Sequence, residues 1–138
     1  MALTIIDAGV LIGFLDAADS HHAAARLELA GATARGDGVS LPASALAESL
    51  VGPVKRGDDA VDAVHAFIAR FPIMVVPVDA AVAEAAARLR ARHGTRLTLP
   101  DALVVATAQV LDADVLVTTD RGWPRRSAMG LRAQVVHL

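Results

Sequence analysis

The chain has 138 residues, which fits one domain with its own hydrophobic core and is too short for two ordinary domains. It contains no cysteine, so disulfides, thiolate catalysis and zinc sites built on cysteine are excluded. Its net charge of −2 is unlike that of a general nucleic-acid binder.

Short apolar runs rich in β-branched residues alternate with helical patterns along the chain. In chain order these patterns predict a strand at residues 3–6, helices at 8–15 and 20–35, a strand at 39–41, helices at 42–50 and 60–70, a strand at 73–76, helices at 79–93 and 99–111, and strands at 115–118 and 134–136. Strands that alternate with helices are typical of a parallel sheet covered on both faces. We find no repeat and no linker, and expect one domain over residues 1–138.

Local signals refine the ends of these elements. Asp19 and Ser20 are expected to cap the second helix. The Gly52-Pro53 pair is expected to end the third helix, with a polar loop over residues 55–59. The helix over residues 99–111 is almost entirely apolar, so we expect it to be buried.

The apolar content of the chain bears on two expectations, its oligomeric state and its location in the cell. Hydrophobic residues make up 54% of the chain and aromatic residues only 3%, so the apolar mass is mainly small aliphatic side chains. This amount can exceed what one core hides, which predicts a homodimer, with the alanine-rich helix over residues 79–92 at the interface. No apolar run approaches the roughly 20 residues of a membrane-spanning helix. The start of the chain lacks the basic segment of a signal peptide. We therefore expect a cytoplasmic protein that makes no contact with membranes.

Four carboxylates fall where an α/β fold would gather them in one cleft. Asp7 closes the first predicted strand and Asp120 follows the fourth, whereas Glu48 and Asp101 lie on helices. Open parallel sheets bind ligands beyond the carboxyl ends of their strands. Crowded carboxylates repel one another and must protonate or find a cation, and Mg²⁺ and Mn²⁺ prefer oxygen ligands. The pattern predicts a hard-cation site suited to cleaving a phosphodiester with water.

Each of these acids also has a purely structural interpretation. Asp7 can cap the helix that follows it, and Asp120 can be a turn residue. Asp101 can complete a capping box with Thr98, a role that is compatible with cation binding. Glu48 can point to solvent, although small neighbours on its helix face would let a metal or a phosphate approach. Taken together, the four acids favour the functional interpretation.

Three arginines follow the last of these acids. Arg121, Arg125 and Arg126 lie beside Asp120, and a phosphate backbone must be neutralised near the acids that cut it. We expect these arginines to bind the substrate and not to support the fold. Trp123 is expected to anchor this segment to the body of the protein.

At these positions the chain resembles a PIN-domain nuclease, and more narrowly a VapC-type toxin of bacterial toxin–antitoxin pairs. The matching segments are Ile6-Asp7-Ala8 with Leu11-Ile12, Ala47-Glu48, residues 99–104 with 106–108, and residues 116–121. The similarity spans essentially the whole chain. It implies a three-layer α/β/α fold with a parallel five-stranded sheet of order 3-2-1-4-5. One departure is Gly9, because the family usually has a serine or threonine there and a hydroxyl near the metal is lost.

The resemblance implies metal-dependent hydrolysis of RNA. Asp7, Asp101 and Asp120 would hold Mg²⁺ or Mn²⁺. Glu48 would hold a water molecule or a second metal, and Thr118 would steady the site through a hydrogen bond. The implied partners are an RNA substrate, a VapB-like antitoxin that covers the cleft, and a second copy of the chain.

Two other functions stay open at this point. A phosphatase of the haloacid dehalogenase type also has an aspartate after its first strand, but it needs a second one where this chain has Gly9. A catalytically weakened PIN-like module would bind RNA or protein without cutting. The intact set of carboxylates argues against this second alternative.

Overall fold

Five short strands form one parallel sheet in the order β3-β2-β1-β4-β5. The computed structural model describes all residues from 1 to 138. Its elements are β1 (Leu3–Ile6), α1 (Ala8–Leu15), α2 (His22–Arg35), β2 (Gly38–Pro42), α3 (Ala43–Arg56), α4 (Asp58–Arg70), β3 (Met74–Val76), α5 (Ala80–His93), a 3-10 turn (Gly94–Arg96), α6 (Leu99–Val110), β4 (Val115–Thr118) and β5 (Gln134–His137). The α/β fold class and the strand order are confirmed.

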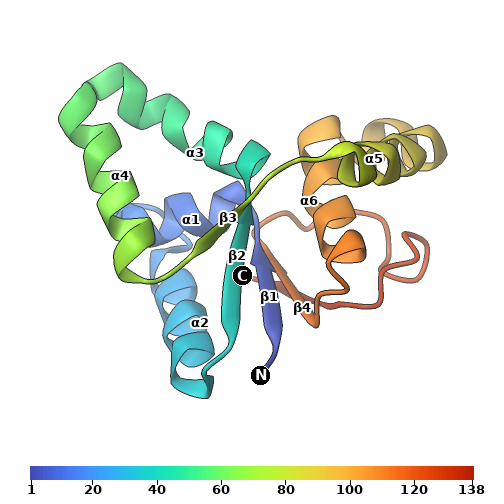
Figure 1. The fold of residues 1–138 in the computed structure, drawn as a ribbon, viewed down its shortest axis with the longest axis horizontal. Helices are drawn as coiled ribbons and strands as arrows, with labels where there is room; N and C mark the ends of the chain where they lie inside the picture. The colour runs from blue at the N-terminus through green and yellow to red at the C-terminus, as the bar shows by residue number, and fades with distance from the viewer.

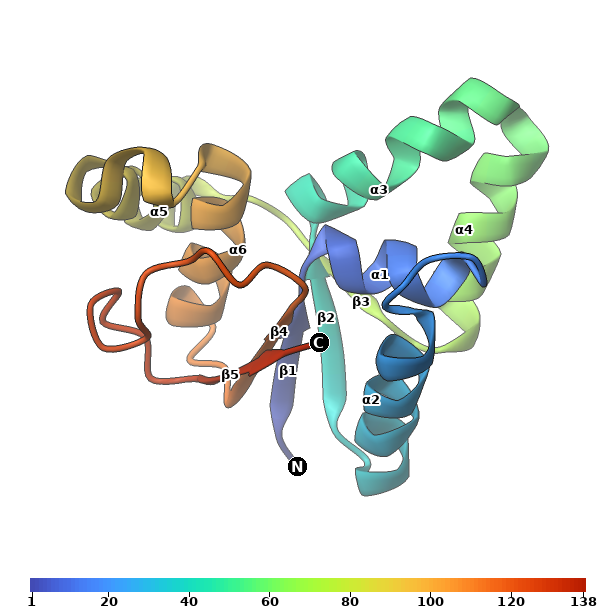
Figure 2. The same cartoon turned by 180° about the vertical axis from the view of Figure 1, so that it is seen from behind.

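Helices cover both faces of the sheet (Figure 1). Helices α1 to α4 gather on one side and α5 and α6 on the other, which Figure 2 shows from the opposite direction. Helix α6 packs against β1, β2 and β4. Because it lies between the sheet and α5, it buries six of its twelve residues, whereas Leu99 and Val110 at its two ends are exposed. None of the helices combines the length and the apolar character needed to cross a bilayer.

The three phenylalanines of the chain join α1 to α4. Phe14 of α1 lies with its ring centroid 4.6 Å from that of Phe67 and 5.1 Å from that of Phe71. The Phe67 and Phe71 centroids are 4.6 Å apart. Tilted and edge-on contacts of this kind add to the stabilisation that burial provides. This aromatic cluster packs α1 against the C-terminal part of α4.

The prediction that α3 ends near residue 50 is wrong. The helix runs through Pro53 to Arg56, and only Gly57, with φ of 120°, separates it from α4. The expected polar loop over residues 55–59 is therefore absent. A proline inside a helix removes one hydrogen bond and is unfavourable by about 3 kcal/mol. Pro53 is buried in this helix, and we attribute the continuity of α3 to that packing.

The expected cap of α2 by Asp19 and Ser20 is also wrong. The helix begins after His21, which makes no capping hydrogen bond with its side chain. Asp19 instead accepts a hydrogen bond from the backbone N–H of His21 at 2.8 Å and so stabilises the turn before the helix. A short acid commonly bonds the backbone two residues on in this way.

The register of the central strands brings two chain segments together. Ile6 of β1 pairs with Val117 of β4, and the backbone N–H of Asp7 donates to the Val117 carbonyl at 3.2 Å. The residues that directly follow β1 and β4 therefore lie side by side at one edge of the sheet. Helix α1 starts from this edge, and α3 starts from the same end of the neighbouring strand β2 (Figure 1).

Candidate active site

Asp7 is held rigidly at the end of β1. It is the N-cap of α1, and its Oδ1 accepts a hydrogen bond from the Val10 backbone N–H at 2.9 Å. Its Oδ2 accepts a hydrogen bond from the Thr118 hydroxyl, and the side chain is only 7% exposed. Burial raises the pKa of the Asp7 carboxyl above its ordinary value of 3.8, although these hydrogen bonds oppose the rise. The helix-cap role predicted for Asp7 is therefore present, and it engages one carboxyl oxygen while Thr118 engages the other.

Thr118 connects the two acids that follow adjacent strands. Its hydroxyl is fully buried, donates to Asp7, and accepts a hydrogen bond from the Asp120 backbone N–H at 3.0 Å. Asp120 is exposed, and its Oδ1 accepts a hydrogen bond from the Gly122 backbone N–H at 2.7 Å. The turn role predicted for Asp120 is therefore present. It leaves the second carboxyl oxygen of Asp120 without a protein partner.

Asp101 lies in the first turn of α6, but it does not form the expected capping box. Thr98 is the N-cap and makes no hydrogen bond to the helix backbone with its side chain. Its hydroxyl donates to Asp101 Oδ2 at 2.9 Å. Burial raises the pKa of the Asp101 carboxyl, the Thr98 hydrogen bond lowers it, and the charge of Asp120 raises it further. The Thr98 hydroxyl thus holds one oxygen of the Asp101 carboxylate instead of capping α6.

Trp123 faces Asp101 from the segment after β4. Its side chain is buried, which confirms the predicted anchor. The indole Nε1 is also buried and completes no hydrogen bond in this geometry. It nevertheless lies close enough to Asp101 to lower the pKa of that carboxyl. Trp123 is the only tryptophan of the chain, so it is a natural optical reporter of events at Asp101.

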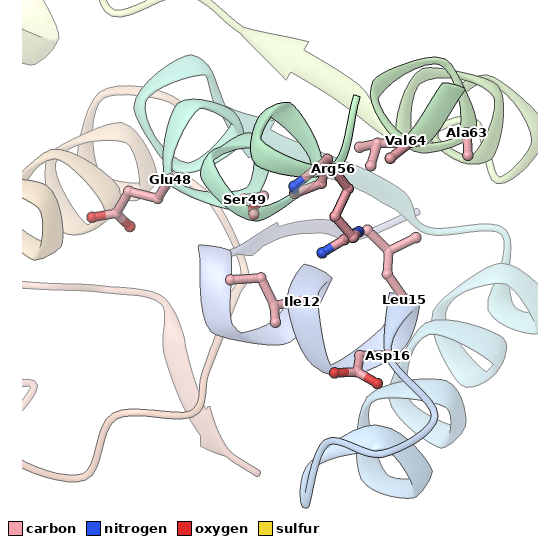
Figure 3. Close-up of a pocket in the computed structure, with 11 residues that line it drawn as sticks. Ile12, Leu15, Asp16, Glu48, Ser49, Arg56, Ala63 and Val64 are labelled. Carbon is pink, nitrogen blue, oxygen red and sulfur yellow. The ribbon is translucent and has the colours of Figure 1, made fainter. Parts of the chain in front are cut away.

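Glu48 is exposed on α3, at one end of a pocket of about 510 Å³ between α1, α3 and α4. Figure 3 shows its carboxylate directed away from Arg56, which lines the same pocket. Although Glu48 is exposed, neighbouring groups partly shield its carboxyl from water, and this desolvation is the largest cause of its raised pKa, followed by the charges of Asp101 and Asp7. Glu48 thus lies on the same side of the molecule as the other acids.

The four acids influence one another electrostatically, and Asp101 interacts with each of the other three. Its negative charge raises the pKa of both Asp7 and Glu48, and the charge of Asp120 raises the pKa of Asp101. None of the four forms an ion pair with a lysine, an arginine or a histidine. The charges are therefore concentrated and uncompensated.

The residues fit a hard divalent cation by their chemistry. All the available donors are carboxylate and hydroxyl oxygens, which Mg²⁺ and Mn²⁺ prefer. Mutual repulsion of the carboxylates is the condition that a cation relieves. No three of the acids lie close enough to form a ready-made metal site. A cation would thus be bound by part of the set directly and by the rest through water, as is usual for Mg²⁺.

The arginines after Asp120 are not free of structural roles, so this part of the prediction is wrong. Arg121 donates to the Leu138 carbonyl at 3.2 Å, and Arg126 Nε donates to the Leu131 carbonyl at 3.2 Å. Arg125 makes no such bond, and all three arginines line one pocket of about 350 Å³ with Trp123. Two of the three guanidinium groups therefore help to fold the segment that carries them.

A model of the PIN domain matches residues 4–128. The chain belongs to the PIN-domain family. Its fold is similar to that of VapBC2 from Rickettsia felis, solved with a promoter DNA fragment, at 15% identity, with a TM-score of 0.72 and coverage of 98% of each chain. It is also similar to VapC20 from Mycobacterium tuberculosis, a sarcin–ricin loop cleaving toxin, at 21% identity, with a TM-score of 0.71 and coverage of 95% of this chain and 98% of that chain.

FitAcB from Neisseria gonorrhoeae has a similar fold at 21% identity, with a TM-score of 0.67 and coverage of 97% of this chain and 96% of that chain. No curated protein matches the sequence of this chain. At these identities the solved structures establish the PIN fold of the chain. Activity and partners have to be argued from its own site.

Proposed function

We propose that this PIN-domain protein is a metal-dependent endoribonuclease and the toxin of a VapBC-type toxin–antitoxin pair. The observation that carries the proposal is the set of four carboxylates that repel one another and have no cationic partner. Membership of the PIN family and the fold shared with VapC20, a toxin that cleaves RNA at the sarcin–ricin loop, support RNA as the substrate. A phosphatase of the haloacid dehalogenase type is not consistent with this family assignment.

We assign Asp7, Asp101 and Asp120 as the residues that hold Mg²⁺ or Mn²⁺. When bound, such a cation lowers the pKa of a water molecule and neutralises charge on the phosphate oxygens. The raised pKa of Glu48 suits it to hold the attacking water and to take its proton, because a base works best when its pKa approaches the working pH. Thr118 keeps the Asp7 carboxylate in one orientation and couples it to the backbone of Asp120.

RNA reaches the acids through the basic pocket beside them. Arg121, Arg125 and Arg126 line that pocket, and guanidinium groups match the geometry of phosphate well. The side chain of Arg125 makes no hydrogen bond to the protein, so it is the arginine best able to move onto the substrate. A basic pocket beside an acidic cleft lets a protein of net negative charge attract a polyanion.

The proposed partners are an antitoxin and a second copy of the chain. Toxin–antitoxin complexes have been solved among proteins of the same fold, which supports the proposal that this chain binds an antitoxin. The pocket in Figure 3 runs from Glu48 past the apolar side chains of Ile12, Leu15 and Val64, and offers an antitoxin segment apolar contacts beside the acids. For the homodimer, α5 buries only its face toward α6 and leaves several alanines exposed. Sedimentation at micromolar concentration tests whether the protein forms this dimer. We further propose that the protein is cytoplasmic.

Cleavage of RNA by the purified protein tests the proposed activity. We expect cleavage of a labelled structured RNA with Mg²⁺ or Mn²⁺, and none with EDTA or with the Asp7→Asn variant. The matched control is Asp62→Asn, which makes the same chemical change at an exposed position of α4. RNA binding without cleavage under all metal conditions would instead identify a weakened PIN-like binding module.

A further inference from the structure

The side chain of Thr119 fills the space next to Gly9, although the two residues are far apart in the sequence. Gly9 lies in the first turn of α1, two residues after Asp7. A Cβ atom added at Gly9 would lie 2.1 Å from Thr119 Oγ1, 3.2 Å from Thr119 Cβ and 3.3 Å from Thr119 Cγ2. The shortest of these distances is far below van der Waals contact. The hydroxyl of Thr119 therefore occupies the space that a side chain at position 9 would take.

This hydroxyl lies among the groups of the acid site. Thr119 directly follows Thr118, whose hydroxyl bonds Asp7, and directly precedes Asp120. The backbone N–H of Thr119 faces the Asp7 carboxylate closely enough to lower its pKa. The Thr119 side chain is half-buried, and its hydroxyl has no hydrogen-bond partner in the protein. One donor hydrogen and two acceptor lone pairs are thus available beside Asp7.

We propose that Thr119 supplies the hydroxyl that position 9 lacks, and that it acts as a positioning residue of the nuclease site. This inference rests on the proposed function of the four acids. The hydroxyl comes from the residue after β4 instead of the first turn of α1, and it lies 2.1 Å from where the Cβ of a side chain at position 9 would be. A hydroxyl there holds a water molecule beside the Asp7 carboxylate and so orients the metal ligands. Groups that orient metal ligands from the outer shell commonly change metal affinity or activity 10- to 100-fold when removed.

Because of this crowding, a side chain at position 9 and the present conformation of the Thr119 side chain cannot coexist. With glycine at position 9, Thr119 can hold its hydroxyl against the helix. With serine at position 9, the new Cβ would lie 2.1 Å from the Thr119 hydroxyl oxygen, so the Thr119 side chain has to rotate and carry its hydroxyl away from this place. With serine at position 9 and alanine at position 119, a hydroxyl is again present and the worst contact is gone. The effects of the two substitutions should therefore be strongly non-additive.

Four variants test the proposal: Thr119→Val, Thr119→Ser, Gly9→Ser and the double variant Gly9→Ser with Thr119→Ala. Three quantities are measured on each, namely Mn²⁺ affinity followed by Trp123 fluorescence, the rate of RNA cleavage, and the melting temperature without metal. Valine keeps the shape of threonine and removes only the hydroxyl. We expect Thr119→Val to weaken Mn²⁺ binding and cleavage by about 10-fold or more. Its melting temperature should stay within about 2 °C of the parent, since valine keeps the shape of threonine and the hydroxyl has no hydrogen-bond partner in the protein.

The other variants separate chemistry from packing. Thr119→Ser should stay within about threefold of the parent in affinity and rate, because it keeps the hydroxyl. Gly9→Ser alone should lower the melting temperature, and the double variant should recover both the melting temperature and the Mn²⁺ affinity. Parent-like Mn²⁺ affinity and cleavage in Thr119→Val would overturn the proposal, as would a double variant no better than Gly9→Ser.

Failure of this inference differs from failure of the proposed function. If Asp7→Asn binds Mn²⁺ and cuts RNA like the parent, the metal-dependent nuclease site itself is wrong, and the role of Thr119 falls with it. If Asp7→Asn loses both properties while Thr119→Val keeps them, only the role of Thr119 is wrong.

Discussion

The acid site and the arginine segment beside it use their charges in opposite ways. Asp7, Glu48, Asp101 and Asp120 repel one another, and no cationic side chain compensates them. In the segment after β4, by contrast, two of the three arginines are bound to backbone carbonyls. Native structures rarely leave partly buried charges unpaired without a function. The difference supports our proposal that the acids bind a cation, and it shows that two of the arginines also stabilise their own segment.

The largest expected effect is loss of cleavage in Asp101→Asn. Asp101 interacts with each of the other three acids, so removing its charge weakens the whole site. We expect the cleavage rate to fall about 100-fold or more, comparable with the loss of other groups that stabilise developing charge. Single-turnover cleavage of labelled RNA measures this, with Asp62→Asn as the control. Parent-like cleavage by Asp101→Asn would show that the central acid of the set has no catalytic role.

The second prediction concerns stabilisation by metal. A cation that binds only the folded acid site stabilises it by about 2.7 kcal/mol when its concentration is 100 times the dissociation constant. Millimolar Mg²⁺ or Mn²⁺ should therefore raise the melting temperature of the parent by several degrees, and that of Asp7→Asn much less. Calorimetric scans with and without EDTA check this. An equal rise in both proteins would indicate that the ions act elsewhere on the surface.

The third prediction concerns the pH dependence of the metal-free protein. The pKa values of Asp7, Glu48 and Asp101 are raised in the folded state, so these groups hold protons that the unfolded chain has already released. Their contribution to stability therefore falls as pH rises from the ordinary acid values through the raised ones. In EDTA, the melting temperature should fall less steeply over this range in Asp101→Asn than in the parent. Parallel pH profiles of the two proteins would contradict the raised pKa values.

The smallest effects should separate the arginines from one another. Arg125→Gln removes a charge with no bond to the protein, so RNA affinity should fall while the melting temperature stays within about 2 °C. The salt slope of binding should become shallower by about 0.7 for one lost contact to single-stranded RNA. Arg126→Gln should in addition reduce stability by about 1 kcal/mol, because it loses the hydrogen bond to Leu131. Filter binding at several salt concentrations and thermal scans test both variants, and equal melting temperatures would refute the distinction.

Local sequence patterns predicted the order of the helices and strands, and they placed Asp7 and Asp120 each directly after a strand. Its alternation of apolar runs and helical patterns predicts a parallel sheet, because each pattern reports which face of an element must be buried. The place of Asp7 and Asp120 after adjacent strands depends on the strand order, which the family resemblance supplied. The prediction that the helix ends before Pro53 was wrong because tertiary packing outweighs the weak local preference of single residues.

The hydrogen bonds and contacts of the site side chains, by contrast, depend on packing that no local pattern predicts. The hydroxyl of Thr98 bonds Asp101 instead of the helix backbone, and Arg126 bonds a carbonyl five residues ahead. The close approach of the Thr119 side chain to Gly9 joins positions 110 residues apart, so no rule of local residue spacing could predict it. Sequence patterns report which face of an element is buried. The atoms that meet across elements are fixed only when the sheet register and the packing of α1 against the end of β4 are set.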